Sequence, residues 1–335
     1  MAEFDIFNPK VSQVVAGIEG KCILIHSNER KVGKTAQACK MPQPLYLRFE
    51  SGINAIPNIP YMELTSWSDF KKVNKQLTNQ KTLAQAKEKY KTIIFDTVDV
   101  AIKWCEQYIC ASEGVATIGQ GNNGYGLWKE YENEWFKEIN KLTNAGYAIY
   151  FISHSEEKKQ VDPITDEEYV QMCPKGDKRT IDLILDLVDI IGYVKGGGIS
   201  EDGEEVLSSV YFANTKEFMG GSRFKYLPKV LTPFTAEGLQ KALKEAVEKE
   251  EKESGTKSIT FEEKQEIEKK TKMSHDELIS AIEPLMKKLW KTHQEEVTDI
   301  VTEYLGEGAK VSETTKKQNQ QLEMILSDLQ DLDEE

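Results

Sequence analysis

The sequence predicts an α/β fold with a mainly parallel sheet, followed by a small helical region at the C-terminal end. Up to about residue 236, short apolar runs alternate with longer segments of helical periodicity. Several of these runs are continuous rather than alternating, which is typical of strands covered on both faces in a parallel sheet. After Pro233 the composition changes to charged, amphipathic segments. The chain therefore combines a large sheet-based region with a smaller helical one.

Six strands are expected in the first region, at residues 21–25, 44–49, 91–95, 148–152, 190–194 and 208–213. A helix is expected between Leu127 and Leu142, where large apolar residues recur at helical spacing, and we interpret its aromatic side chains as core. The polar segment 155–180 contains a turn signal at 162–166, which predicts a hairpin. The glycine-rich segment 195–203 predicts a turn-rich connector between two strands.

The composition divides the chain into three parts. We expect an α/β core over 1–236, a charged helical linker over 237–260, and a helical region with an acidic tail over 261–335. Thr235 is a suitable N-cap for the first of these helices, and Ser274 opens a capping-box pattern. Residues 237–335 hold 25 acidic and 15 basic residues, so they carry −10 of the net charge of −13. This balance argues against a general electrostatic coat for nucleic acid, but it leaves room for a local basic groove.

Several classes of protein are disfavoured. No run approaches ~18 consecutive apolar residues, so we expect no membrane span. The acidic N-terminus lacks the pattern of a secretion signal. The five cysteines include no C-x-x-C pair, and the four histidines do not cluster with them at zinc spacing. We therefore expect a cytoplasmic protein with reduced, buried cysteines.

A phosphate-binding loop is predicted directly after the first apolar run. Gly33-Lys34-Thr35 stands between that run and a helix-like segment, where backbone N–H groups, a lysine and a hydroxyl can hold phosphate and Mg²⁺. The loop pattern asks for glycine five places before Gly33, and this chain has Asn28 there. Asparagine tolerates left-handed backbone, so the replacement is physically mild. The predicted cofactor-binding residues are Asn28, Glu29, Arg30, Lys31, Val32, Gly33, Lys34, Thr35 and Ala36.

Two carboxylates follow predicted strands. Asp96 ends the apolar run 91–95, and a buried carboxylate is costly unless something binds it. We interpret it as the second Mg²⁺-binding residue after Thr35; the alternative is a cap for the next helix. Glu50 ends the run 44–49 and is the candidate for orienting or deprotonating the attacking water, with an ordinary surface glutamate as the alternative.

A polar pair, Ser153 and His154, ends the fourth predicted strand. Polar side chains at this place can sense whether a γ-phosphate is present. The alternative for His154 is a cap or a local ion pair.

The strings ILIHSNERKVGKT, PLYLRFESGINAI, YKTIIFDTVD and AIYFISHSEE, in this order and spacing, resemble phage-encoded RecA-like P-loop ATPases of the single-strand annealing and recombination type. The resemblance covers roughly residues 10–235. It implies a RecA-like core that binds ATP and Mg²⁺, with Gly33, Lys34 and Thr35 in the phosphate loop and Asp96 as the magnesium aspartate. It also implies Glu50 as the catalytic glutamate and Ser153-His154 as the sensor.

The same resemblance implies an oligomer, a ring or a filament, in which a basic residue of one subunit contacts the γ-phosphate held by its neighbour. Lys216 and Arg223, in the segment 214–229, are the candidates, and ordinary solvated charges are the alternative. Single-stranded DNA is the expected partner, contacted by the loops 155–180 and 214–229, and a single-strand-binding protein is a further expected partner. The acidic residues of 155–180 outnumber its basic ones, however.

Three functions stay open at this point. The first is an ATPase acting on single-stranded DNA in annealing or strand exchange. The second is an ATP-gated scaffold with little turnover, which Asn28 favours. The third is a P-loop kinase for a small molecule, and the absence of an arginine-rich lid pattern counts against it.

Overall fold

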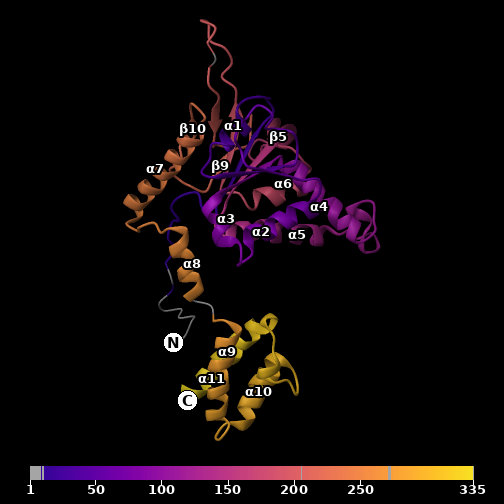
Figure 1. Cartoon of the computed structure of the whole chain (residues 1–335), viewed down its shortest axis with the longest axis vertical. Helices are drawn as coiled ribbons and strands as arrows, with labels where there is room; N and C mark the ends of the chain where they lie inside the picture. The colour runs from indigo at the N-terminus through magenta and orange to yellow at the C-terminus, as the bar shows by residue number, and fades with distance from the viewer. Residues whose placement is uncertain (1–8, 10, 205, 271–272, 335) are drawn as a thin grey trace. The chain divides into compact units, whose positions relative to one another are not determined.

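A computed structural model describes residues 9, 11–204, 206–270 and 273–334. The chain forms two compact units: the larger one spans Gln13–Phe261, and the chain from Glu262 onward belongs to the smaller one. Figure 1 shows both units, coloured along the chain. Among the described residues, no helix is both long enough and apolar enough to cross a bilayer.

The first unit is built on a sheet whose central strands are all parallel. In spatial order these are β7 (Ile190–Lys195), β1 (Cys22–Ser27), β5 (Ala148–Val161), β4 (Thr92–Asp96) and β2 (Pro44–Arg48). The short strand β3 (Tyr61–Glu63) pairs with β2 at one edge. At the other edge β8 (Ser209–Tyr211), β9 (Gly221–Ser222) and β10 (Val230–Leu231) add antiparallel pairs. The predicted α/β fold and all six predicted strands are confirmed.

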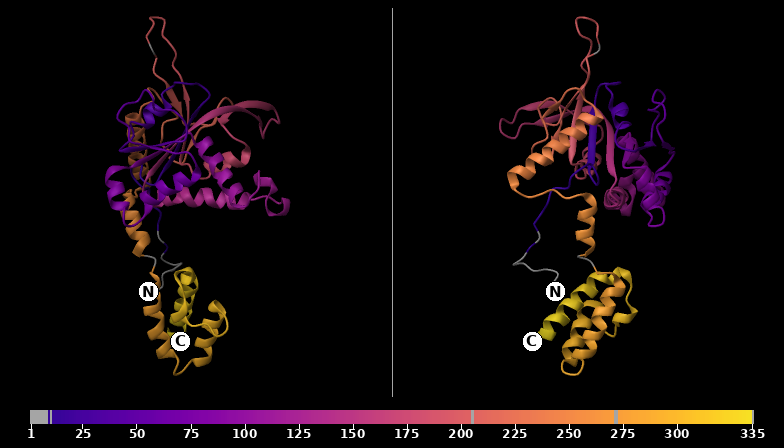
Figure 2. Two further views of the ribbon diagram at one scale, coloured as in Figure 1. Left: turned by 45° about the vertical axis from the view of Figure 1, so that its right-hand side comes forward. Right: turned by 60° about the vertical axis from the view of Figure 1, so that its left-hand side comes forward.

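Helices cover both faces of this sheet (Figures 1 and 2). On one face lie α2 (Trp67–Thr78), α3 (Leu83–Lys89), α4 (Val98–Ser112), α5 (Trp128–Asn144) and α6 (Lys178–Leu185). The other face carries α1 (Lys34–Ala38) and α7 (Ala236–Ser254). Successive residues of a strand alternate between the two layers, so Leu24 belongs to the first core and Ile23 and Ile25 to the second. This is why the strands read as continuous apolar runs in the sequence.

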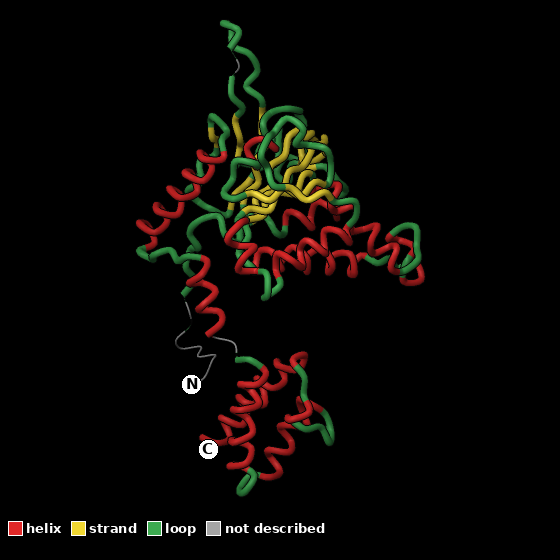
Figure 3. Tube along the Cα trace, in the orientation of Figure 1, coloured by secondary structure: helices red, strands yellow, loops and turns green. Residues whose placement is uncertain are grey.

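A polar hairpin and a polar loop leave the sheet at β5 and β7. Strand β5 is longer than the predicted 148–152, because its polar second half pairs with β6 (Glu168–Pro174) from Ser155 to Val161. The predicted hairpin is therefore confirmed. The glycine-rich connector between β7 and β8 projects as an arm, which is the green loop at the top of Figure 3.

Helix α7 places the domain boundary later than the sequence suggested. Residues 237–260 were expected to be a linker, but Leu239, Ala242 and Leu243 of α7 are buried against the sheet. Thr235 caps the helix by accepting a hydrogen bond from the backbone N–H of Gly238, as expected. The charge of this segment lies on its exposed side and hid the apolar face.

The second unit is helical. It contains α9 (His275–Leu289), α10 (Gln294–Leu305) and α11 (Asn319–Glu334), and α8 (Phe261–Lys270) crosses the boundary between the units. Its core is a cluster of aliphatic side chains that includes Ile282, Val297 and Ile325. The predicted capping box is present, since Ser274 and Glu277 exchange hydrogen bonds at the start of α9.

Candidate functional site

The predicted phosphate loop joins the end of β1 to the start of α1. Gly33 has a φ of 89°, in the left-handed region, and Lys31 has a φ of 63°. A Cβ at Gly33 would meet nothing within 4 Å, so the backbone conformation rather than space requires glycine there. The loop thus turns sharply into the helix N-terminus, which is the arrangement that directs backbone N–H groups at an anion.

Asn28 acts through its side chain rather than through its backbone. It is not among the described residues with positive φ, so its tolerance of left-handed backbone is not used here. Instead the Tyr193 hydroxyl of β7 donates a hydrogen bond to Asn28 Oδ1 over 2.6 Å. The next residue is held from just beyond this strand, because the Gly196 N–H donates to Glu29 Oε2 over 3.0 Å. Strand β7 therefore fixes the first half of the loop.

The Lys34 ammonium lies over the loop. Its Nζ donates to the Glu29 carbonyl oxygen over 3.1 Å. Burial lowers the pKa of Lys34, and the carboxylates of Asp96, Glu29 and Glu50 oppose that shift. The ammonium therefore sits among three carboxylates, where an incoming phosphate would meet it.

Thr35 and Asp96 are brought together as predicted. Thr35 Oγ1 donates to Asp96 Oδ2 over 2.7 Å, and the aspartate is 3% exposed at the end of β4. Burial raises the pKa of Asp96, whereas the hydrogen bonds from Thr35 and Tyr46 lower it. Asp96 does not cap helix α4, whose N-cap is Thr97. A hydroxyl and a buried carboxylate are hard oxygen ligands, so this pair fits Mg²⁺.

Tyr46 and Gly52 belong to this site and were missed from the sequence. The Tyr46 hydroxyl is fully buried and donates to Asp96 Oδ2 over 2.9 Å. A Cβ at Gly52 would lie 2.5 Å from the Tyr46 hydroxyl and 3.0 Å from Asp96 Oδ2, so only glycine fits. The chain after β2 thus closes directly over the aspartate.

Glu50, just after the end of β2, and His154, within β5, form a pair. Glu50 Oε1 and His154 Nε2 are 3.4 Å apart, and both side chains are partly exposed. The hydrogen bond with His154 lowers the pKa of Glu50, and the same contact raises the pKa of His154. The Glu50 N–H donates to the Asp96 carbonyl oxygen, which places the glutamate beside the metal-binding pair.

Ser153, the other half of the predicted sensor, does not take part in this contact among the described interactions. It is fully buried, and its Oγ donates to the carbonyl oxygen of His154. Of the two, His154 alone makes a side-chain contact with Glu50 among the described interactions.

His26, directly before the loop, connects three elements and was not recognised in the sequence. Its Nδ1 accepts from Ser155 Oγ and its Nε2–H donates to the Met219 carbonyl oxygen, each over 2.8 Å. Burial lowers the pKa of His26 to about 4, so the ring is neutral and this tautomer is fixed by its two partners. Beside it, the rings of Tyr193 and Phe218 stack with centroids 4.6 Å apart. Strand β1 is thereby tied to the hairpin and to the segment 214–219.

Lys216 and Arg223 are bound to carboxylates of their own chain. Lys216 Nζ lies 2.8 Å from Asp162 in the turn of the hairpin. Arg223 lies 3.2 Å from Asp189, whose other oxygen accepts from the Cys22 N–H at the start of β1. Both are exposed, and their predicted action on a neighbouring subunit stays a prediction.

The two loops predicted to contact DNA lie side by side. The Met172 N–H of β6 donates to the Glu217 carbonyl oxygen, and the Met219 N–H donates to the Met172 carbonyl oxygen. The segment 214–219 therefore runs along the hairpin.

Comparison with known proteins identifies the family. A family model described as AAA domain matches residues 20–224. An uncharacterized protein derived from the SPbeta prophage of Bacillus subtilis strain 168, YorG, is 43% identical over 329 residues. The alignment covers 98% of this chain and 98% of that protein. The match to the family model includes the phosphate loop, Asp96, Glu50 and His154.

Proposed function

This chain belongs to the AAA-domain family, and from that premise we propose that it is a magnesium-dependent ATPase that works as an oligomer on single-stranded DNA. The observation that carries the proposal is the 2.7 Å contact between Thr35 at the end of the phosphate loop and Asp96 at the end of β4. In P-loop proteins two groups hold Mg²⁺: the hydroxyl of the residue after the loop lysine, and a carboxylate at the end of a strand. The prophage origin of the 43% identical relative supports a phage origin for this chain, and we propose that its role lies in phage recombination or replication.

The residues divide the work of hydrolysis. Lys34 would contact the β- and γ-phosphates, and Thr35 and Asp96 would hold the metal. Magnesium, when bound, neutralises charge on the phosphate oxygens. Glu50 accepts a proton from water as the water oxygen bonds to the γ-phosphorus. The bond from that phosphorus to the bridging oxygen breaks, and ADP leaves with the electron pair.

His154 controls the state of Glu50 in this proposal. A protonated imidazole held 3.4 Å away keeps the carboxylate ionised but lowers its basicity. Neutral His154 would leave Glu50 a stronger base. The pair therefore makes turnover depend on how His154 is contacted when nucleotide is bound.

DNA and a second subunit are the partners that the proposal adds. Lys216 and Arg223 are the candidates for contacting the γ-phosphate of a neighbouring subunit, as positive charge stabilises the transition state of phosphoryl transfer. Each would first have to leave its present partner, Asp162 or Asp189.

One set of assays tests the proposal. ATP hydrolysis is measured with and without single-stranded DNA for the wild type, Lys34→Ala and Glu50→Gln. We expect DNA to stimulate the wild type, Lys34→Ala to lose nucleotide binding, and Glu50→Gln to bind ATP but lose turnover by about 100-fold or more. Full turnover in Glu50→Gln would overturn its role as the base.

An ATP-gated scaffold is the second candidate, and the contact between Glu50 and His154 favours it. A glutamate engaged by a histidine is a poor base. Tight ATP binding by the wild type, with no hydrolysis at any DNA concentration, would select the scaffold.

A further inference from the structure

A strongly basic stretch of the chain lies outside the site described above. Residues 71–91 hold seven lysines and one acidic residue, Glu88, so this stretch carries 7 − 1 = +6 in a chain of net charge −13. It includes most of α2, all of α3 and the approach to β4. A concentration of one sign on a chain of the opposite sign is a signature of a polyanion-binding surface.

Part of this stretch lines a groove between α2 and α5. The groove has a volume of about 470 Å³. We call it the lysine groove, and its lining residues are Lys71, Lys72, Lys75, Thr78, Asn79, Glu138 and Lys141. Lys81 is next to it, since its backbone N–H donates to Asn79 Oδ1.

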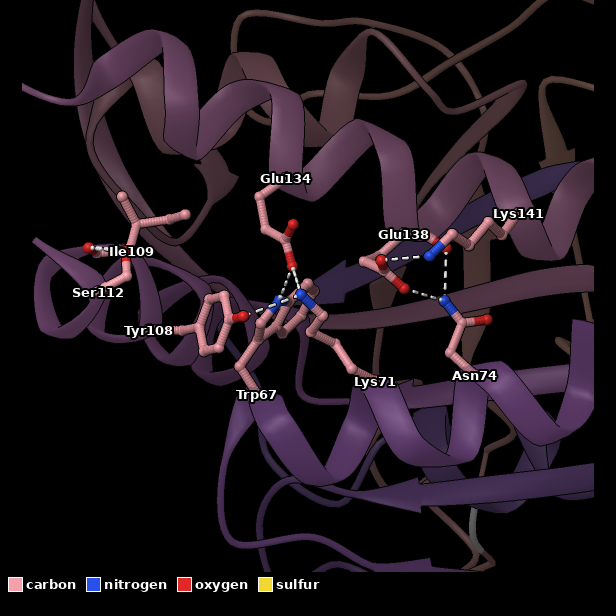
Figure 4. Close-up of polar contacts among 9 residues, drawn as sticks. All are labelled: Trp67, Lys71, Asn74, Tyr108, Ile109, Ser112, Glu134, Glu138 and Lys141. Carbon is pink, nitrogen blue, oxygen red and sulfur yellow. Dashed lines mark hydrogen bonds and ion pairs between the residues drawn. The ribbon is translucent and has the colours of Figure 1, made fainter. Parts of the chain in front are cut away.

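The acidic side chains of the groove lie beneath its lysines. Glu134 and Glu138 of α5 have side chains only 10% and 2% exposed, and they pair with Lys71 and Lys141 over 2.7 and 2.5 Å. Figure 4 shows both glutamates directed from α5 toward α2. Lys71 also donates to the Tyr108 hydroxyl over 3.1 Å. A lysine has three N–H groups, so each ammonium retains at least one donor beyond these partners. The buried pairs thus hold two of the lysines in place at the rim.

Lys72 pairs with Asp69 over 3.0 Å. The exposed lysines Lys75, Lys81, Lys89 and Lys91 of the stretch 71–91 have no ion-pair partner among the described residues.

In the segments 155–180 and 214–229 more of the cations are paired: Lys158, Lys159, Lys216, Arg223 and Lys225 each lie within an ion pair of their own chain. Among the described residues Lys175, Lys178, Arg179 and Lys229 have no ion-pair partner, so the hairpin retains a smaller set of unpaired cations at its end.

The groove suits a phosphodiester backbone better than a lipid surface. The apolar side of α2, with Phe70, Val73 and Leu77, is buried in the core. In the described chain no large apolar side chain is exposed between Met62 and Tyr125. This stretch therefore offers no apolar side chain that could insert into a bilayer beside the lysines. Neutral hydrogen-bonding groups, Thr78 and Asn79, lie among them instead, as is common at nucleic-acid backbones.

We propose that the lysine groove binds the phosphate backbone of nucleic acid and supplies more of the electrostatic attraction than the hairpin does. The inference rests on the proposed function, which makes nucleic acid the polyanion that this chain meets. Lysines on a helix surface read no bases, so the contact is independent of sequence.

The test compares three triple variants of the full chain, each lacking three positive charges. Lys72→Gln/Lys75→Gln/Lys81→Gln alters the groove. Lys175→Gln/Lys178→Gln/Arg179→Gln alters the end of the hairpin segment 155–180, just after β6 and at the start of α6. Lys241→Gln/Lys244→Gln/Lys252→Gln, on the exposed side of α7, controls for the change in net charge.

Binding of a fluorescent oligothymidylate is followed by anisotropy over a range of salt concentrations. Each lost contact with a single strand removes about 0.7 from the slope of log K against log salt, so three contacts remove about 2 and about 100-fold in affinity at ~0.1 M salt. We expect this loss for the groove variant, a smaller one for the hairpin variant and little for the control. Binding of fluorescent ATP by all three should match the wild type.

Each other outcome has a definite meaning. Equal oligonucleotide affinity of the wild type and the groove variant, or a larger loss of affinity in the hairpin variant, refutes the proposal for the groove. The proposal that the chain binds DNA would still stand. A wild type that binds no oligonucleotide at low salt overturns both the groove and the DNA part of the proposed function. A groove variant that loses only binding to vesicles of anionic lipid, with oligonucleotide affinity unchanged, assigns the lysines to a membrane and also refutes the inference.

Discussion

The contact between Tyr193 and Asn28 predicts how this phosphate loop works without its first glycine. Tyr193→Phe removes one hydroxyl and leaves the ring stacked on Phe218. A hydrogen bond between neutral groups contributes about 0.5–1.5 kcal/mol net. Asn28 is exposed, so its oxygen can return to water, which places the loss near about 0.5–1 kcal/mol. If the contact preorders the loop, ATP affinity should fall by about 2- to 5-fold.

The assay is a titration with fluorescent ATP and Mg²⁺ for Tyr193→Phe, Asn28→Ala and the double variant. The two losses should not add, because both changes remove the same hydrogen bond. Asn28→Gly, which restores the usual residue, should weaken binding rather than improve it, since the new glycine lacks the acceptor. Additive losses of ATP affinity, or a gain of affinity in Asn28→Gly, would refute the idea that the hydrogen bond from Tyr193 to Asn28 orders the loop in place of the missing glycine.

Three further predictions concern the carboxylates of the site. Tyr46→Phe removes a donor to the buried Asp96, so it should lower the free energy of unfolding by about 1.5–3 kcal/mol, as a denaturant titration can measure. It should also raise the Mg²⁺ concentration needed for ATP binding, which a Mg²⁺ titration checks. Gly52→Ala should abolish magnesium-dependent ATP binding with the fold retained by circular dichroism, because the new methyl would lie 2.5 Å from the Tyr46 hydroxyl. The contact of Glu50 with His154 stabilises the fold in the pH range between the lowered pKa of Glu50 and the raised pKa of His154. That stability is lost as pH rises through the pKa of folded His154 or falls through that of folded Glu50, so His154→Ala should flatten unfolding free energy against pH.

The sequence was informative wherever a pattern is local. Continuous apolar runs located the strands, and the order of strand, glycine, lysine and threonine located the loop. Asp96 could be paired with Thr35 because both follow strands whose carboxyl ends meet at one edge of a parallel sheet. These inferences need only spacing and the direction of the chain.

Contacts that depend on strand register could not be found in this way. Tyr46 reaches Asp96 because β2 pairs with β4, placing Arg48 beside Asp96, and nothing in the letters of either strand states that register. Tyr193 reaches Asn28 because β7 lies next to β1. The buried face of α7 was hidden in a segment whose average composition is charged. In each case the missing information is which elements are neighbours.

Strand β5 gives the nucleotide site and the hairpin a common element. Its first half lies in the sheet between β1 and β4, and its second half is one arm of the hairpin. His154, which contacts Glu50, stands at the junction, and the next residue, Ser155, is bonded to His26 of the strand that leads into the phosphate loop. Because His26 is neutral and fully buried, it has no solvent to replace either partner. A shift of His154 on nucleotide binding would therefore move the base of the hairpin and β1 together. This is the physical route by which ATP could act on the partner that the hairpin contacts.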